Sequence, residues 1–258
     1  MSKSKRREIP HFNTAIIETH CHLDYLDADE LATTLEKTAA AGVEKIITIA
    51  VSPANLSSVL ALTRHATNIW GTQGVHPHEA QSYDPQTEAL IRSNAADERI
   101  LAIGEIGLDY HYDHAERSVQ RKVFEQQLQL AADLDMPVVI HTREADDDTR
   151  DILRAFAPLL KRKGVIHSFT SGLPLAEYCL SEGFMLGFNG IATFNRADNV
   201  REVIAAAPLE QILLETDAPY LTPAPQKNKT RRNEPAFVKS ILLKLADVRQ
   251  EDPGKLAD

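Results

Sequence analysis

The stretch SVQRKVFEQQLQLAADLDMPVVIH, residues Ser118–His141, contains a helix pattern followed directly by a strand pattern. Its first part, Ser118–Asp135, has apolar residues at helical spacing, and they predict one buried face formed by Val119, Val123, Phe124, Leu128, Ala131 and Ala132. Pro137–His141 is short and apolar, as expected of a buried strand. A helix that leads into a buried strand predicts a unit of a parallel α/β sheet.

Similar short, β-branched runs occur along the chain and alternate with helical patterns. Together they predict eight strands: Ala15–Thr19, Lys45–Val51, Ile69–Val75, Ile100–Glu105, Pro137–His141, Val165–His167, Phe184–Phe188 and Gln211–Glu215. A stretch able to form a helix follows each of the first seven, and a final helix opened by Pro235 follows the eighth. This order predicts an α/β fold, a (β/α)8 TIM barrel. The alternative is an open doubly wound sheet, although no glycine-rich dinucleotide fingerprint follows the first strand.

Two helix starts are predicted from local signals. Ser52-Pro53 and Asp84-Pro85 each place a capping residue before a proline, which suits the first helical position.

The composition is that of an ordinary globular protein. The chain has 258 residues, 43% hydrophobic and 25% charged, and we expect a basic tail over residues 1–13 and a single barrel domain over residues 14–258. With no apolar run long enough to span a bilayer and only two cysteines, a cytoplasmic location without membrane attachment is expected. The net charge of −9 argues against a broad basic surface for nucleic acid.

Polar residues follow the predicted strands. His20 and His22 in ETHCHLD alternate along the first strand, so both imidazoles point to one face. Further histidines and carboxylates lie at the carboxyl ends of other predicted strands. The complete set of candidate site residues is His20, His22, Glu105, His141, His167 and Asp217. The carboxyl ends of the strands of a parallel barrel meet at one mouth, so these groups should converge there. Imidazoles and carboxylates together predict a metal site at this C-terminal face.

The set is large enough for two divalent ions. His20, His22 and Asp217 could hold one, His141 and His167 the other, and the two oxygens of Glu105 could bridge them. Zn or Mn suits these ligands better than Mg does, and the sequence does not choose among the three. Glu105 and Asp217 are the predicted catalytic residues, with Asp217 orienting the attacking water.

Several motifs in order resemble those of the TatD-like metal-dependent deoxyribonucleases, within the amidohydrolase-type barrels. They are ETHCHLD, GVHPH, GEIGLDY, the stretch from Gln120 to Thr149, GVIHSFT and LLETDAPYLTP followed by RRNEP. The resemblance implies an α/β barrel and metal-dependent hydrolysis of DNA phosphodiesters, exonucleolytic on single strands, with the same six ligand positions. Glu18 stands where the family usually has Asp, a residue expected to orient a ligand.

Three residues are candidates for substrate binding. The resemblance suggests that His76 lies near the substrate rather than on a metal, and a rim histidine that caps a loop is the alternative. Arg143 could bind a phosphate, or it could pair with Glu144 or another carboxylate at the barrel top. Arg232 lies in the basic stretch Gln226–Pro235, which is either a phosphate-binding loop or a solvated one.

Three functions remain open on these residues. The first is a two-metal phosphodiesterase with DNA, or RNA, as substrate and no obligate protein partner. The second is an amidohydrolase-type enzyme that cleaves an amide, lactone or phosphate ester on the same barrel, since loops alone separate the two. The third is a protein with a structural metal site, which the absence of cysteine ligands disfavours.

Overall fold

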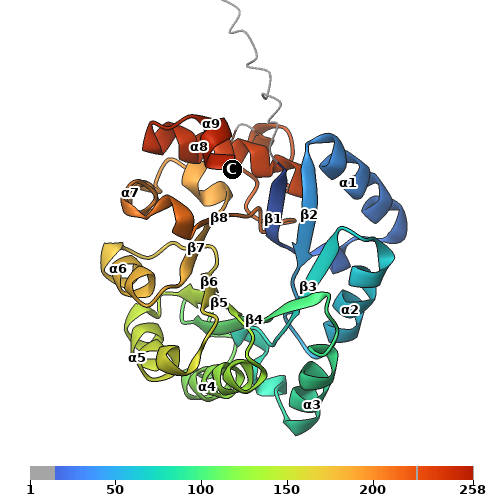
Figure 1. Cartoon of the computed structure of the whole chain (residues 1–258), viewed down its shortest axis with the longest axis vertical. Helices are drawn as coiled ribbons and strands as arrows, with labels where there is room; N and C mark the ends of the chain where they lie inside the picture. The colour runs from blue at the N-terminus through green and yellow to red at the C-terminus, as the bar shows by residue number, and fades with distance from the viewer. Residues whose placement is uncertain (1–14, 225, 258) are drawn as a thin grey trace, which may run out of the picture.

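In the computed structural model, which describes residues 15–224 and 226–257, the chain forms a (β/α)8 barrel. Its parallel strands follow chain order: β1 Ile16–Cys21, β2 Val43–Thr48, β3 Ile69–Gln73, β4 Ile100–Asp109, β5 Val138–Arg143, β6 Gly164–Ile166, β7 Met185–Phe188 and β8 Ile212–Leu214. The strands form a central ring and the helices surround it (Figure 1). The predicted barrel is therefore confirmed.

The helices occupy the connections between strands. In chain order they are α1 Ala28–Ala40, α2 Leu56–His65, α3 Pro85–Asn94, α4 Arg117–Leu134, α5 Asp146–Phe156, α6 Leu173–Ser181, α7 Asp198–Ala206, α8 Val238–Arg249 and the short α9 Pro253–Ala257. Short 3-10 turns join them to the strands, and Pro235 opens one of these directly before α8. Among the described helices, none has the length and apolar character needed to cross a membrane.

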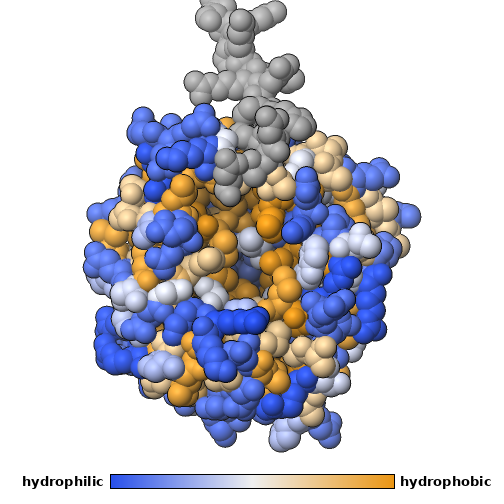
Figure 2. Space-filling view, in the orientation of Figure 1, coloured by the Kyte–Doolittle hydropathy of each residue, from blue (hydrophilic) through white to orange (hydrophobic). Residues whose placement is uncertain are grey.

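Side chains alternate between the two faces of the barrel wall. Ile140 of β5 and Ile166 of β6 belong to the core packed between strands and helices, together with Phe124 and Leu128 of α4. Val139 and Val165, the neighbours of these isoleucines, point the opposite way and form a second apolar cluster with Ala102 and Leu213. The polar outer surfaces of the helices surround an apolar centre (Figure 2).

The residues directly after β8 close the barrel against the end of β1. Asp217 N donates to His20 O at 2.8 Å, and His22 N donates to Ala218 O at 2.8 Å. The carboxylate of Glu18 adds a side-chain link, because its Oε1 accepts hydrogen bonds from the backbone N–H groups of His20 and Thr216, at 3.0 and 2.9 Å. The closure places the ends of β1 and β8 side by side.

Several predicted element ends differ from the observed ones; the strand predicted over Lys45–Val51, for example, spans Val43–Thr48. Two further differences concern α2 and β4. The helix start at Ser52-Pro53 is wrong: these residues form a turn, and α2 begins at Leu56 because the Asn55 side chain accepts the N–H groups of Val51 and Ser52. Strand β4 continues four residues past Glu105, since it stays paired with β5 as far as Asp109 and Arg143.

The start of α3 after Asp84 is as predicted, with the Asp84 carboxylate accepting from Thr87 N. The predicted basic tail over residues 1–13 lies outside the described residues, so the division into this tail and a domain over residues 14–258 stays a prediction.

Candidate metal centre

The structure brings all six predicted ligands together at the carboxyl ends of the strands. His20, Glu105 and His141 lie on β1, β4 and β5, and His22, His167 and Asp217 lie in the loops directly after β1, β6 and β8. His20, His22, Glu105 and His167 are buried, and His141 and Asp217 are partly exposed at the mouth. The convergence follows from strand order, because each side chain sits where its strand ends.

His20, His22 and Asp217 form one group of candidate ligands, at the junction between the end of β1 and the loop after β8. His22 Nε2 lies 3.3 Å from Asp217 Oδ1, and His20 Nε2 lies 3.7 Å from the same oxygen. These three residues each present a ligand atom within 4.8 Å of the others. That spacing allows a single cation to contact all three.

Glu105 lies between this group and the opposite wall. Its Oε2 is 3.3 Å from His20 Nε2, whereas its Oε1 is 2.8 Å from His167 Nε2 and 3.1 Å from His141 Nδ1. His76 Nε2 also lies 3.3 Å from Oε1. The two carboxylate oxygens thus face different sets of imidazoles, which is the geometry that a bridging ligand needs.

The donor chemistry fits divalent cations. In the described residues, Nε2 and Nδ1 of His20, Nδ1 of His22 and Nδ1 of His167 are buried without a hydrogen-bond partner. Buried polar atoms without partners are costly, and coordination through Nε2 would satisfy the most central of them, that of His20. Imidazole and carboxylate ligands are those expected for Zn or Mn.

Burial and neighbouring charges set the protonation states. Burial raises the pKa of Glu105, but the imidazoles of His167, His76 and His141 outweigh it and hold that pKa well below its usual range. Burial lowers the pKa of His76 to about 4, and burial with the His167 charge lowers the pKa of His20. An ionised Glu105 and neutral imidazoles at His20 and His76 are in the state that binds metal.

Asp109 is a member of the site that the sequence reasoning missed. Its Oδ2 lies 3.0 Å from His141 Nε2 and 3.1 Å from His78 Nε2, and it is buried at the end of β4. The signal was present in GEIGLDY, because Asp109 follows Glu105 by four residues and therefore shares its face of an extended strand. The predicted end of the strand at Glu105 hid this relation.

A cavity of about 490 Å³ opens above the centre. Its walls include His76, Arg143 and three tyrosines, Tyr25, Tyr112 and Tyr220. The tyrosines are about half exposed, at 41%, 57% and 52%, and they offer flat apolar surfaces around a charged floor. Such a mouth can hold a ligand that combines rings with an anionic group.

Comparison with known proteins adds to this geometry. The sequence profile of the TatD-related DNase family matches residues 17–258. The chain belongs to the TatD-related DNase family. A TatD protein of Erwinia tasmaniensis, named a 3'-5' ssDNA/RNA exonuclease, is 37% identical over 86% of this chain and 87% of its own. An uncharacterized metal-dependent hydrolase of Bacillus subtilis (strain 168), YabD, is 33% identical over 91% of both chains.

A solved TatD-family structure has the same fold. The crystal structure of YJJV, a TatD homologue from Escherichia coli K12, superposes with a TM-score of 0.87 at 31% identity, covering 94% of this chain and 93% of its own. The family resemblance stated from the motifs is confirmed, and the small-molecule alternative is not favoured.

Two buried carboxylates outside the ligand set support this TatD-family centre. Glu18, which stands where the family usually has Asp, accepts a hydrogen bond from the backbone N–H of His20, and burial raises its pKa to about 8. Glu215 accepts from Ser168 N at 2.6 Å and lies 3.6 Å from His167 Nδ1. Gly187 makes room for it, since a Cβ there would lie 2.5 Å from Glu215 Oε2.

The three predicted substrate residues lie in different places. His76 and Arg143 line the mouth, and the Arg143 guanidinium lies 5.7 Å from the centre of the Tyr112 ring. Arg232 instead pairs with Glu30 of α1, Nη1 to Oε1 at 2.8 Å, beside a separate cavity behind His22. The structure therefore brings two of the three together at the centre, and a substrate role for Arg232 stays a prediction.

Proposed function

We propose that this protein hydrolyses phosphodiester bonds of single-stranded DNA from the 3′ end. Membership of the TatD-related DNase family supports the enzyme class, a metal-dependent hydrolase, and the 37% identical Erwinia relative is named a 3'-5' ssDNA/RNA exonuclease. The observation that carries the proposal is Glu105, whose two oxygens face separate groups of imidazoles across one mouth. RNA is a second substrate of the same chemistry.

The proposed centre would hold two divalent ions. His20, His22 and Asp217 would hold one, His141 and His167 would hold the other, and Glu105 would supply an oxygen to each. His76 could add a nitrogen to the second group, because His76, Glu105 and His141 also present ligand atoms within 4.8 Å. When bound, such ions stabilise negative charge on the phosphoryl oxygens and lower the pKa of water toward neutrality.

The chain's own residues position the water and accept its proton. Asp217 Oδ1 faces His20 and His22, and the pKa of Asp217 is held below its usual value because these imidazoles outweigh the effect of its burial. An ionised Asp217 at the mouth orients a water toward phosphorus and takes its proton as the new oxygen–phosphorus bond forms. The bond from phosphorus to the leaving sugar oxygen breaks, and this oxygen takes up a proton, which Asp217 can return.

Substrate contacts are local, as the net charge of −9 requires. Tyr25, Tyr112 and Tyr220 around the mouth give stacking surfaces for the terminal bases. Arg143 lies among them and supplies a planar cation for a phosphate. A cytoplasmic location and the absence of an obligate protein partner remain predictions from the sequence.

The test compares defined substrates on metal-reconstituted protein. We expect stepwise shortening of single-stranded DNA labelled at its 5′ end, and block of this reaction by a 3′-terminal phosphorothioate linkage. Amide, lactone and simple phosphate esters are assayed beside it. Turnover of one of these esters with no release of nucleotides from DNA or RNA would refute the nuclease proposal and favour the small-molecule hydrolase.

A further inference from the structure

A second cavity, of about 870 Å³, adjoins the mouth of the metal centre. Arg143 and Leu221 line both cavities, so the two are continuous across these side chains. Its walls come from the loops after β4, β5, β6 and β7 and the starts of α5 and α7. Small-ligand sites have volumes of roughly 300–1,000 Å³, and this cavity is near the top of that range. It is additional to the cavity above the metal centre.

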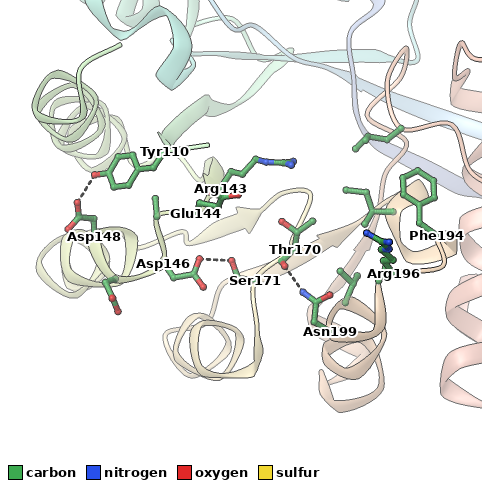
Figure 3. A pocket seen from close by; sticks show the side chains of 16 residues that line it. Tyr110, Arg143, Glu144, Asp146, Asp148, Thr170, Ser171, Phe194, Arg196 and Asn199 are labelled. Atoms are coloured by element: carbon green, nitrogen blue, oxygen red, sulfur yellow. Dashed lines mark hydrogen bonds between the residues drawn. The ribbon is translucent and has the colours of Figure 1, made fainter. Parts of the chain in front are cut away.

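Arginines stand on opposite walls of this cavity. Figure 3 shows Arg143 on the side of Tyr110 and Glu144, and Arg196 on the side of Phe194. Within the described part of the chain, neither arginine forms a hydrogen bond or ion pair through its guanidinium. Both are therefore free to bind an anion.

The acidic residues of the cavity are occupied by partners in its own wall. Glu144 contacts His111 at 2.7 Å, Asp146 accepts from Ser171 Oγ at 2.7 Å, and Asp147 pairs with Arg150 at 2.7 Å. Asp148 accepts from Tyr110 and pairs with Arg121. Arginines therefore neutralise Asp147 and Asp148, whereas Glu144 and Asp146 keep their negative charge but are hydrogen-bonded to neighbouring side chains. An anion in the cavity would contact Arg143 and Arg196, which have no carboxylate partner among the described residues.

Three apolar side chains line the cavity in addition to its charged residues. Ile191, Phe194 and Leu221 line the cavity with Arg196, and Leu221 also lines the mouth of the metal centre. Lys227 Nζ lies 4.0 Å from the centre of the Phe194 ring and adds a third cation beside this ring. An apolar surface bordered by cations suits the bases and phosphates of a single strand.

We propose that this cavity binds the strand that remains after cleavage, the nucleotides on the 5′ side of the scissile bond. This inference rests on the proposed function and adds a substrate path to it: the strand passes over Leu221 beside Arg143, and Arg196 binds an internal phosphate. The enzyme then prefers oligonucleotides long enough to place a second phosphate in the cavity.

The test separates long from short substrates. An unphosphorylated thymidine dinucleotide carries only the scissile phosphate, whereas a thymidine decanucleotide also fills the cavity. Arg196→Gln should raise KM for the decanucleotide roughly three- to tenfold while raising it much less for the dinucleotide. It should also flatten the dependence of log Kd on log salt by about 0.7, the change for one lost phosphate contact on a single strand.

A matched control is available at the other end of the barrel. Arg162 precedes β6, is exposed and has no side-chain partner among the described residues. Arg162→Gln makes the same charge change and should leave KM and the salt slope of both substrates at wild-type values.

Other results would overturn the inference. An equal rise in KM for both substrates, or weaker inhibition by thymidine 5′-monophosphate in Arg196→Gln, would place the leaving nucleotide in the cavity instead. Binding of the labelled decanucleotide to metal-loaded Asp217→Asn, with and without Arg196→Gln, is measured by fluorescence anisotropy. If the wild-type protein turns over neither substrate but decanucleotide binding depends on Arg196, the proposed nuclease chemistry is refuted and the strand path is supported. Decanucleotide binding that does not depend on Arg196 refutes the strand path.

Discussion

Asp109 Oδ2 lies 3.0 Å from Nε2 of His141, while Nδ1 of the same ring faces Glu105 at 3.1 Å. The imidazole is therefore fixed at both nitrogens. The other oxygen of Asp109 accepts from the backbone N–H groups of His111 and Tyr112, which fixes the carboxylate in turn. Contacts of this kind orient a metal ligand and increase its basicity.

Asp109→Asn should weaken metal binding about 10- to 100-fold, because an amide keeps the shape of the carboxylate but loses its charge. Activity should return when metal is added in excess. Titration of the metal-free protein by calorimetry measures the affinity. Asp113→Asn, the same change at an exposed residue nearby, is the control, and equal affinities in the two variants would leave Asp109 without an orienting role.

Glu105→Ala should reduce the number of ions per chain from two to one or fewer, since both proposed positions depend on this carboxylate. Elemental analysis after metal loading and gel filtration gives the count, and circular dichroism checks the fold. A folded variant that retains two ions and normal turnover would show that Glu105 does not bridge.

Asp217→Asn should lower kcat by about two to four orders of magnitude, the usual range for a positioned acid–base group, while retaining most of the metal. His20→Ala should instead lose metal first, with activity partly recovered at high metal concentration. Steady-state rates over a range of metal concentrations distinguish the two. Wild-type rates in Asp217→Asn at every accessible pH would exclude Asp217 as the base.

Glu18→Gln should keep most of the stability that Glu18→Ala loses. Burial raises the pKa of Glu18 to about 8, so its carboxyl is mainly neutral at pH 7, and an amide retains the oxygen that accepts from His20 and Thr216. Alanine leaves both buried N–H groups unsatisfied, at a cost of about 1–3 kcal/mol each. Urea unfolding of the metal-free proteins at pH 7 measures the difference, and equal losses in both variants would contradict it.

Stability should fall in alkaline solution partly through Cys179. Burial raises the pKa of this thiol from 9.0 to about 12, so the folded protein holds the proton where the unfolded chain releases it. The contribution is therefore complete below pH 9 and decreases as the pH rises toward 12. When the pH is raised from 8 to about 10, the free energy of unfolding should fall by about 1 kcal/mol less in Cys179→Ala than in the wild type. Urea unfolding at the two pH values measures this difference.

The sequence carries enough information for the strands and the ligands because each strand is a short apolar run that ends in a polar residue. His141 and His167 follow such runs directly, so parallel order alone brings them together. Asp109 was not predicted as a site residue because the pairing that extends β4 past Glu105 is a tertiary contact with β5.

Loop geometry could not be read in the same way. Arg232 lies 202 residues from its partner Glu30, and no local pattern reports an ion pair at that distance. The cavity of Arg143 and Arg196 is built from loops that follow several different strands. Charge in these segments is visible in the sequence, but the partner of each charge is not.

The hydrogen bonds that join the end of β1 to the loop after β8 have a consequence for protein synthesis. His20 and Asp217 stand on the two sides of this closure, and His20 leaves the ribosome long before Asp217 does because it comes much earlier in the chain. A growing polypeptide lacks the complete centre until β8 and Asp217 have emerged and docked on β1. The proposed nuclease therefore has no means of cutting nucleic acid near the ribosome that makes it until its barrel is closed.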